Sequence, residues 1–180
     1  VWAPSSYMTG VGVTVNTVPS QPNATFMGYC DNYNSTTHTF SGNCALTRTI
    51  SSTANSDYHF FAKFACNPGY SNSGDPGCGA GNSPNAFNAC TGNTITVNYT
   101  NGGCGTVSSP TTGTCTYGGT LTLHAAASGC SGQNFAGWSI NGEEYSAADV
   151  IPCTYETLGV YSGSATATAQ WSSGYYKITL

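Results

Sequence analysis

The clearest pattern in the sequence is a two-residue alternation of apolar and polar positions in the C-terminal half. It occurs in three segments, 94–100, 120–125 and 165–171, in which the polar positions are mostly threonine. A period of two is typical of a β-strand that buries one face and exposes the other. The pattern therefore predicts three half-buried strands with threonine-rich outer faces.

The N-terminal half shows the same alternation more weakly. Val11, Val13 and Val15 are separated by polar or small residues, and the even positions of segment 58–66 form an apolar face. Only segment 142–151 has a composition that favours a short helix. The sequence thus predicts an all-β fold with little helix.

Changes in pattern along the chain divide it into parts. Residues 67–93 are rich in Gly, Pro, Asn and Ser, which indicates a long loop that needs covalent pinning. We expect two small disulfide-stapled β domains, preceded by an extended N-terminal strand or arm. The expected bounds are 1–20 for the arm, 21–93 for the first domain, 94–174 for the second and 175–180 for a C-terminal strand.

The composition is unusually poor in charge. The 180 residues include three Lys and Arg and seven Asp and Glu, or 6% charged, whereas soluble domains carry about 25%. Three basic residues cannot neutralise a nucleic-acid backbone, so we expect no nucleic-acid partner. We also expect no membrane span, because no apolar run is long enough. Solubility then requires either covalent glycans or association with other copies.

The nine cysteines indicate disulfide bonds. No C-x-x-C spacing occurs, which argues against a zinc site, and the count is high for a reduced compartment. We therefore expect a secreted protein, extracellular or at a cell surface, with one cysteine left over. The cysteines lie at positions Cys30, Cys44, Cys66, Cys78, Cys90, Cys104, Cys115, Cys130 and Cys153.

Spacing suggests a pairing scheme. Cys104 and Cys115 are symmetric about Ser109 and Pro110, so a hairpin turning there would place them opposite each other. The two remaining cysteines of this half, Cys130 and Cys153, then form a second bridge.

In the N-terminal half we assume that cysteines adjacent in sequence pair, as in a domain with short loops, and this predicts the bridge Cys30–Cys44. Two of the three cysteines Cys66, Cys78 and Cys90 are expected to pair.

An ordered set of short motifs in residues 99–172 resembles the Listeria–Bacteroides repeat, the module of internalin-like surface proteins. These motifs are NGG, YG, F-x-GW and A-x-W, at Asn101, Gly102, Gly103, Tyr117, Gly118, Phe135, Gly137, Trp138, Ala169 and Trp171. The resemblance implies a small β-grasp-like module of a secreted bacterial surface protein, which serves as a stalk or spacer and sometimes binds. It also implies core positions for Trp138 and Trp171. The four cysteines of this half depart from the family, whose members are usually cysteine-poor.

Catalytic, cofactor and metal sites are not indicated. His38, His59 and His124 fit surface positions, and Glu143 and Glu144 are adjacent, so on a strand they would point to opposite faces. The acidic residues Asp31, Asp57 and Asp75 are too scattered to predict a calcium site. We expect a protein that is not an enzyme.

Three N-glycosylation sequons begin at Asn23, Asn34 and Asn98. Chance alone predicts a similar number in a chain this rich in Ser and Thr. Asn98 is favoured because the alternation of its strand places it on the outer face. We expect a glycan on at least one of the three, with Asn98 and Asn34 ahead of Asn23.

Together these features favour a structural subunit of an extracellular fibre or pilus-like filament, whose partners are other copies of itself. The segment Val11–Val18 is the expected donor strand, with Val11, Val13 and Val15 filling alternate pockets in the next subunit. Two alternatives remain open: this strand pairs within its own domain, or residues 175–180 are the donor. The alternative function is a secreted binding or adhesion module, for example one that binds carbohydrate.

Overall fold

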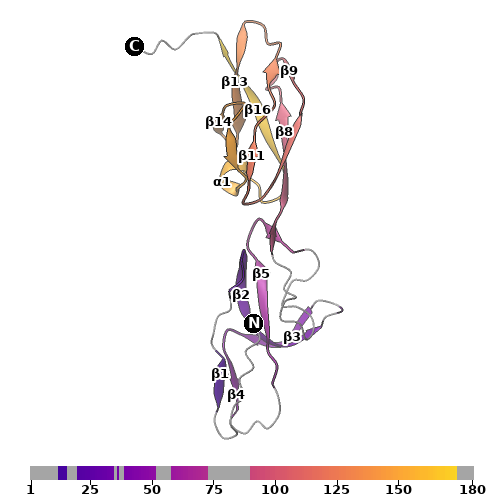
Figure 1. The fold of residues 1–180 in the computed structure, drawn as a ribbon, viewed down its shortest axis with the longest axis vertical. Coiled ribbons are helices and arrows are strands. Elements are labelled where there is room, and N and C mark those ends of the chain that lie inside the picture. Colours follow the sequence, from indigo (N-terminus) through magenta and orange to yellow (C-terminus); the bar gives the residue numbers. More distant parts are fainter. Residues whose placement is uncertain are drawn as a thin grey trace, which may run out of the picture. The chain divides into compact units, whose positions relative to one another are not determined.

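The chain forms two compact units, residues 1–91 and 92–180. The computed structural model describes residues 12–15, 20–34, 36, 39–51, 58–72 and 90–173. Within these residues both units are built almost entirely of β-strands (Figure 1), and the one helix has four residues. The predicted all-β fold with disulfide-stapled domains is therefore confirmed. None of the described helices is long and apolar enough to cross a bilayer.

Unit 1 is centred on a three-stranded antiparallel sheet in the order β3-β2-β5. Strand β1 pairs with β4, and β6 pairs with β7. The strands in the chain up to residue 92 are β1 (Val13–Val15), β2 (Ala24–Asn34), β3 (Thr39–Ala45), β4 (Arg48–Ile50), β5 (Phe61–Cys66), β6 (Tyr70–Ser71) and β7 (Thr91–Gly92).

The central strand β2 is interrupted by two bulges, which shift its register between Phe26 and Gly28 on one side and between Cys30 and Asn32 on the other. Gly28 has a φ of +130°, and a Cβ there would lie 3.0 Å from the carbonyl carbon of Ala45. Glycine is therefore required at this point for β3 to approach closely.

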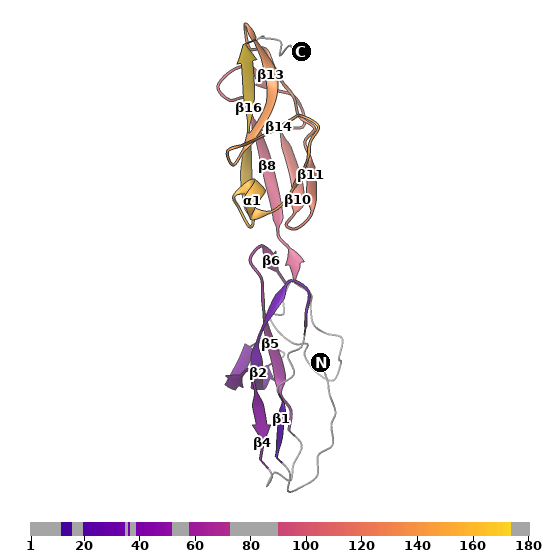
Figure 2. The same cartoon turned by 90° about the vertical axis from the view of Figure 1, so that its left-hand side faces the viewer.

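Unit 2 contains a mixed five-stranded sheet in the order β10-β8-β16-β13-β14, in which β8 and β16 are parallel (Figure 2). Two small sheets, β11–β15 and β9–β12, contribute residues to the same core. The elements are β8 (Thr94–Thr100), β9 (Thr106–Val107), β10 (Thr112–Thr116), β11 (Thr120–Thr122), β12 (Ala127–Ser128), β13 (Gln133–Ile140), β14 (Glu143–Tyr145), β15 (Val150–Pro152), α1 (Tyr155–Leu158) and β16 (Gly163–Ser173).

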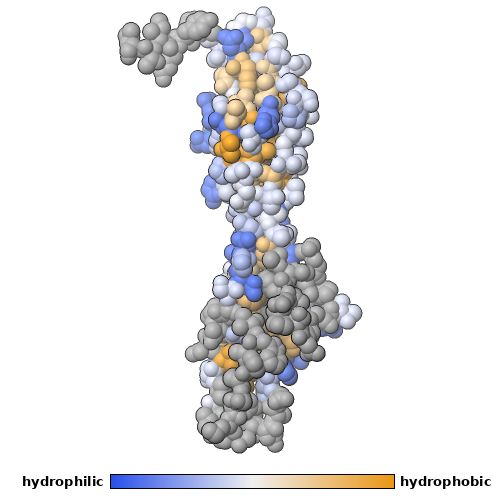
Figure 3. Space-filling model, in the orientation of Figure 1, coloured by the Kyte–Doolittle hydropathy of each residue, from blue (hydrophilic) through white to orange (hydrophobic). Residues whose placement is uncertain are grey.

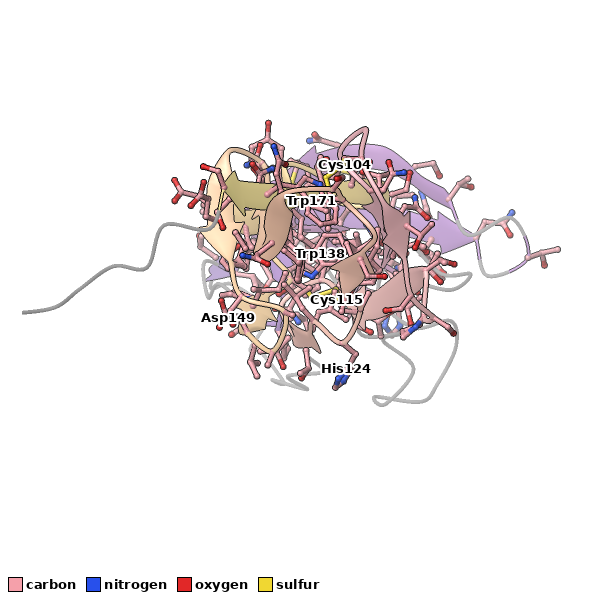
Figure 4. The ribbon with its side chains drawn as sticks, turned by 90° about the horizontal axis from the view of Figure 1, so that it is seen from above. Cys104, Cys115, His124, Trp138, Asp149 and Trp171 are labelled. Carbon is pink, nitrogen blue, oxygen red and sulfur yellow. A yellow bond between two sulfur atoms is a disulfide. The ribbon has the colours of Figure 1, made fainter. Side chains whose placement is uncertain are left out.

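The alternation predicted for unit 2 is confirmed. Except for Trp171, the apolar positions of its three alternating segments are buried, each at 8% exposure or less: Ile95, Val97, Tyr99, Leu121, Leu123, Ala125, Ala165, Ala167 and Ala169. Trp138 is fully buried in the same core, where its indole N–H donates to the carbonyl oxygen of Ala125 (Figure 4). Trp171 is half-buried at the edge of this core, and its indole N–H donates to Asn101.

In the N-terminal half the predicted patterns hold only in part. The face expected over segment 58–66 begins later, because β5 starts at Phe61 and Tyr58 is 49% exposed. Ala62 and Phe64 are buried as expected. The C-terminal segment 175–180 lies outside the described residues.

Two disulfides of unit 1 agree with the sequence-based expectations. Cys30 is bonded to Cys44, directly across from it in the β2–β3 ladder. Cys66 is bonded to Cys90, so two of the three cysteines in that region pair, and Cys78 lies outside the described residues.

The pairing predicted for unit 2 is wrong. Cys104 is bonded to Cys130, and Cys115 to Cys153. The expected hairpin about Ser109 does not form, because β10 pairs with β8 and places Cys115 opposite Ile95.

The chain between β8 and β10 instead passes through β9, which pairs with β12 and brings Cys104 close to Cys130. Cys115 is buried and faces Cys153 across the core. Tertiary pairing of distant strands, rather than local symmetry, decides the connectivity.

The helix expected at 142–151 is also wrong. This segment forms β14 and β15, and the short helix α1 follows them. The reason is the turn Asn141–Gly142, in which both residues have positive φ, +49° and +86°. An Asn-Gly pair with this geometry closes a two-residue hairpin, and it directs β14 back along β13.

Candidate functional site

The segment expected to act in assembly forms a short ladder in the single chain. Residues Val13–Val15 pair antiparallel with Arg48–Ile50, with Thr14 opposite Thr49. The hydroxyl oxygens of these two threonines are 3.2 Å apart. The strand therefore forms an edge pairing of three residues, and Val11 lies outside the described residues.

The core beneath this ladder is small. Among the described residues of unit 1 the cluster has three buried members, Tyr29, Ala62 and Phe64, and the half-buried Val15 packs against it. The corresponding cluster of unit 2 has sixteen. In this described part of unit 1, the two disulfides and the packing of Val15 add to a small apolar cluster.

A half-buried cation links β4 to β2 and β3. The guanidinium of Arg48 pairs with the carboxylate of Asp31, donates to the carbonyl oxygen of Asn43 at 2.6 Å and lies 4.8 Å from the ring centre of Phe60. The other described basic residue, Lys63, lies 5.8 Å from the ring of Phe40. Both cations thus make contacts within unit 1.

The outer face of the five-stranded sheet in unit 2 consists mainly of threonine and serine side chains, and we call it the hydroxyl face. Its rows run across β10, β8 and β16, and cross-strand neighbours include Thr114, Thr96 and Ser164 in one row and Thr112, Asn98 and Thr166 in the next. Strongly hydrophilic side chains are scattered over unit 2 rather than gathered into one patch in the view of Figure 3. The side chains that make up this face are Thr94, Thr96, Asn98, Thr100, Thr112, Thr114, Thr116, Ser139, Ser164, Thr166, Thr168 and Gln170.

The three sequons occupy different settings. The amide nitrogen of Asn23 donates to the carbonyl oxygen of Cys90, and the amide oxygen of Asn34 accepts from the backbone N–H of Thr36. Asn98 lies half-buried in the middle of the hydroxyl face, and no described residue hydrogen-bonds to its carboxamide. Asn23 and Asn34 are exposed, and Asn98 is the most buried of the three.

A shallow depression of about 390 Å³ lies at one end of this sheet, between β13, β14 and β16. It lies where β13 bulges between Phe135 and Gly137. Polar groups of Glu144, Gln170 and Ser172 line it, together with the half-buried Trp171. This combination of amide, carboxylate and hydroxyl groups suits the recognition of a small polyhydroxylated ligand.

The histidines that the structure describes lie at the surface. His59 and His124 are exposed, and His124 points away from unit 2 in Figure 4. Within the described ranges no group of three His, Cys, Asp or Glu side chains could hold a metal ion.

The resolved pKa shifts have local causes. The hydroxyl and backbone N–H of Ser146 donate to Asp149 and lower the pKa of its carboxyl group. Hydrogen bonds from its own backbone N–H and from the Thr154 hydroxyl lower the pKa of Glu156. Burial raises the pKa of the Tyr99 hydroxyl.

Comparisons of this chain with models of protein families, with curated proteins and with solved structures find no match. Sequence reasoning located Asn98 and the outward threonines, because both follow from period-two alternation. It missed the depression, which depends on the Gly137 bulge, and the Arg48–Asp31 pair, which depends on how β4 folds onto β2.

Proposed function

We propose that this protein is a structural subunit of an extracellular, glycosylated fibre or pilus-like filament, in which strand β1 of one copy pairs with β4 of the next. The observation that carries the proposal is the β1–β4 ladder: a peripheral strand of three residues packs Val15 against a small core. Exchange of an identical element between copies preserves every contact and is therefore a low-cost route to assembly.

Exchange of β1 gives a closed dimer when it is reciprocal and an open chain when each copy donates to the next and the rotation does not close. The proposal takes the second form. Low charge supports this reading, because ten charged residues in 180 give little electrostatic resistance to association. Four disulfides support a secreted, oxidising setting for the subunit.

The β-grasp-like module implied by the sequence resemblance fits this role. In unit 2 the motif residues have structural positions: a Cβ at Gly102 would lie 2.3 Å from the carbonyl oxygen of Ala169, and Trp171 donates to Asn101. These contacts support treating the motifs as determinants of a stable stalk module and not as a ligand site.

A cysteine pair tests the exchange directly. In the double variant Thr14→Cys/Thr49→Cys the two side chains face each other across the ladder, at a spacing that a disulfide can bridge. We expect oxidised, assembled material to give a ladder of covalent multimers on a non-reducing gel. The single variants Thr14→Cys and Thr49→Cys are the controls, because either introduced cysteine could instead form a disulfide with Cys78 of another copy.

Filaments in which this pair cross-links only within monomers would contradict the exchange. A chain that lacks residues 1–18 gives a second measurement: we expect a folded monomer that no longer polymerises. Normal filaments from this truncated chain would also contradict the proposal.

The alternative, a secreted binding or adhesion module, is favoured by the polar depression beside Gln170. Negative-stain microscopy of native material separates the two functions. A fibre subunit gives filaments, whereas a binding module gives discrete particles.

A further inference from the structure

We propose that Asn98 carries an N-linked glycan that lies along the outer face of unit 2, with its distal sugars seated in the depression beside Gln170 and Glu144. The inference rests on the secreted, glycosylated character of the proposed function, but it does not depend on strand exchange. The glycan would cover the hydroxyl face and fill the depression.

The attachment point is well placed. Asn98 and Thr100 are two residues apart on β8, so both sequon side chains point to the outer face. The neighbours of Asn98 across the ladder are Thr112 and Thr166, both exposed, and Asn98 itself is half-buried between them.

The covalent step balances with a named donor. An N–H bond of the Asn98 amide is replaced by a bond from Nδ2 to the first carbon of the sugar. The sugar comes from an activated oligosaccharide phosphate, and the phosphate leaves with the proton. Thr100 supplies the sequon hydroxyl.

The path from Asn98 to the depression is short. Asn98 lies level with Thr166, and Gln170 is four residues further along β16, or about 13 Å. The outer-face residues between them are Thr100 and Thr168, whose hydroxyl oxygens are 3.4 Å apart. A short oligosaccharide can span this distance over a surface of methyl and hydroxyl groups.

The depression offers suitable partners at the far end of that path. Glu144 lies opposite Ser139, which in turn lies opposite Thr168, so the carboxylate lies on the same face as the threonine rows. Gln170 donates its amide N–H to the backbone of Thr168, and its amide oxygen remains available to accept from a sugar hydroxyl. Carboxylate and amide groups of this kind hydrogen-bond adjacent hydroxyls of a pyranose ring.

A double-mutant cycle tests the seat of the glycan. The variants are Asn98→Gln, which removes the attachment point, and Gln170→Ala, which keeps the sequon, both produced in the native host. We expect Gln170→Ala to lower the melting temperature of the glycosylated protein by several degrees and to have little effect in the Asn98→Gln background. Thr116→Ala, on the same face but away from the path, is the matched control and should behave identically in both backgrounds.

Two further measurements complete the test. Intact-mass and peptide analysis of the native protein should show saccharide on the peptide that contains Asn98, and an unmodified Asn98 would overturn the proposal. If the effects of Asn98→Gln and Gln170→Ala on the melting temperature are additive, the glycan does not bind in the depression, and that part of the proposal is overturned. Binding of free polysaccharide by the glycan-free Asn98→Gln protein, lost in Asn98→Gln/Gln170→Ala, would show an external ligand and would also overturn it. Filament formation by Asn98→Gln is scored separately, because it reports on strand exchange alone.

Discussion

Gly137 shows how one residue shapes a surface of unit 2. Its φ of +137° is a conformation that other residues rarely adopt, and a Cβ would lie 2.3 Å from the carbonyl oxygen of Tyr145. The glycine therefore lets β14 approach β13 closely at the bulge.

Replacing this glycine should be costly. We expect Gly137→Ala to lower the free energy of unfolding by roughly 3 kcal/mol or more, since backbone strain and overpacking of a backbone oxygen act together. Urea denaturation measures the change.

The control is Gly103→Ala, because Gly103 also has a positive φ, +86°, but open space around its Cβ position. It should lose only about 1–2 kcal/mol, the conformational cost alone. Equal losses in the two variants would show that the contact with Tyr145 is unimportant.

At this scale the sequence predicts some residues well and others poorly. Ile95, Val97 and Tyr99 were expected to be buried and Asn98 to face outward, because strand periodicity fixes the face of each side chain. The bulge at Gly137 was not expected, since a glycine within a strand pattern does not reveal which strand will lie against it.

At the scale of elements, local rules succeed where partners are near in sequence. Cys30 and Cys44 were paired correctly, because β2 and β3 are neighbouring strands of one ladder. Hairpin symmetry failed for Cys104 and Cys115, whose partners Cys130 and Cys153 lie 26 and 38 residues away, just after β12 and β15. Only the tertiary arrangement of β9, β12 and β15 contains that information.

The two kinds of bridge should differ in their contribution to stability. In the chain-entropy model the loop closed by Cys115–Cys153 contributes about 4 kcal/mol and that closed by Cys30–Cys44 about 3 kcal/mol. Relative to the wild-type protein, we expect Cys115→Ala/Cys153→Ala to lower the free energy of unfolding of unit 2 by about 1 kcal/mol more than Cys30→Ala/Cys44→Ala lowers that of unit 1, each measured with a probe of its own unit. The reverse order would show that strain or residual unfolded structure outweighs loop length.

At the scale of the whole molecule, the two units differ in the size of their described cores. Unit 2 has sixteen buried residues in one cluster, whereas the cluster of unit 1 has three. We therefore expect two unfolding transitions in urea, with unit 1 unfolding first.

Two probes separate these transitions. Trp138 and Trp171 both belong to unit 2, so in a Trp2→Phe variant tryptophan fluorescence follows that unit alone. Far-UV circular dichroism follows both units and should change at lower urea than the fluorescence does. Coincident curves would instead indicate a single cooperative unit.

The parallel pairing of β8 with β16 also determines how unit 2 responds to tension. The chain enters unit 2 at the start of β8 and leaves the described part at the end of β16, at opposite ends of this strand pair (Figure 1). A pulling force along the chain therefore acts parallel to both strands. It loads the hydrogen bonds between them in shear, so that these bonds must break together and not one after another. If the pair does yield, the Cys115–Cys153 bridge keeps the intervening segment from being drawn out. A filament built from such units would stretch little before it breaks elsewhere.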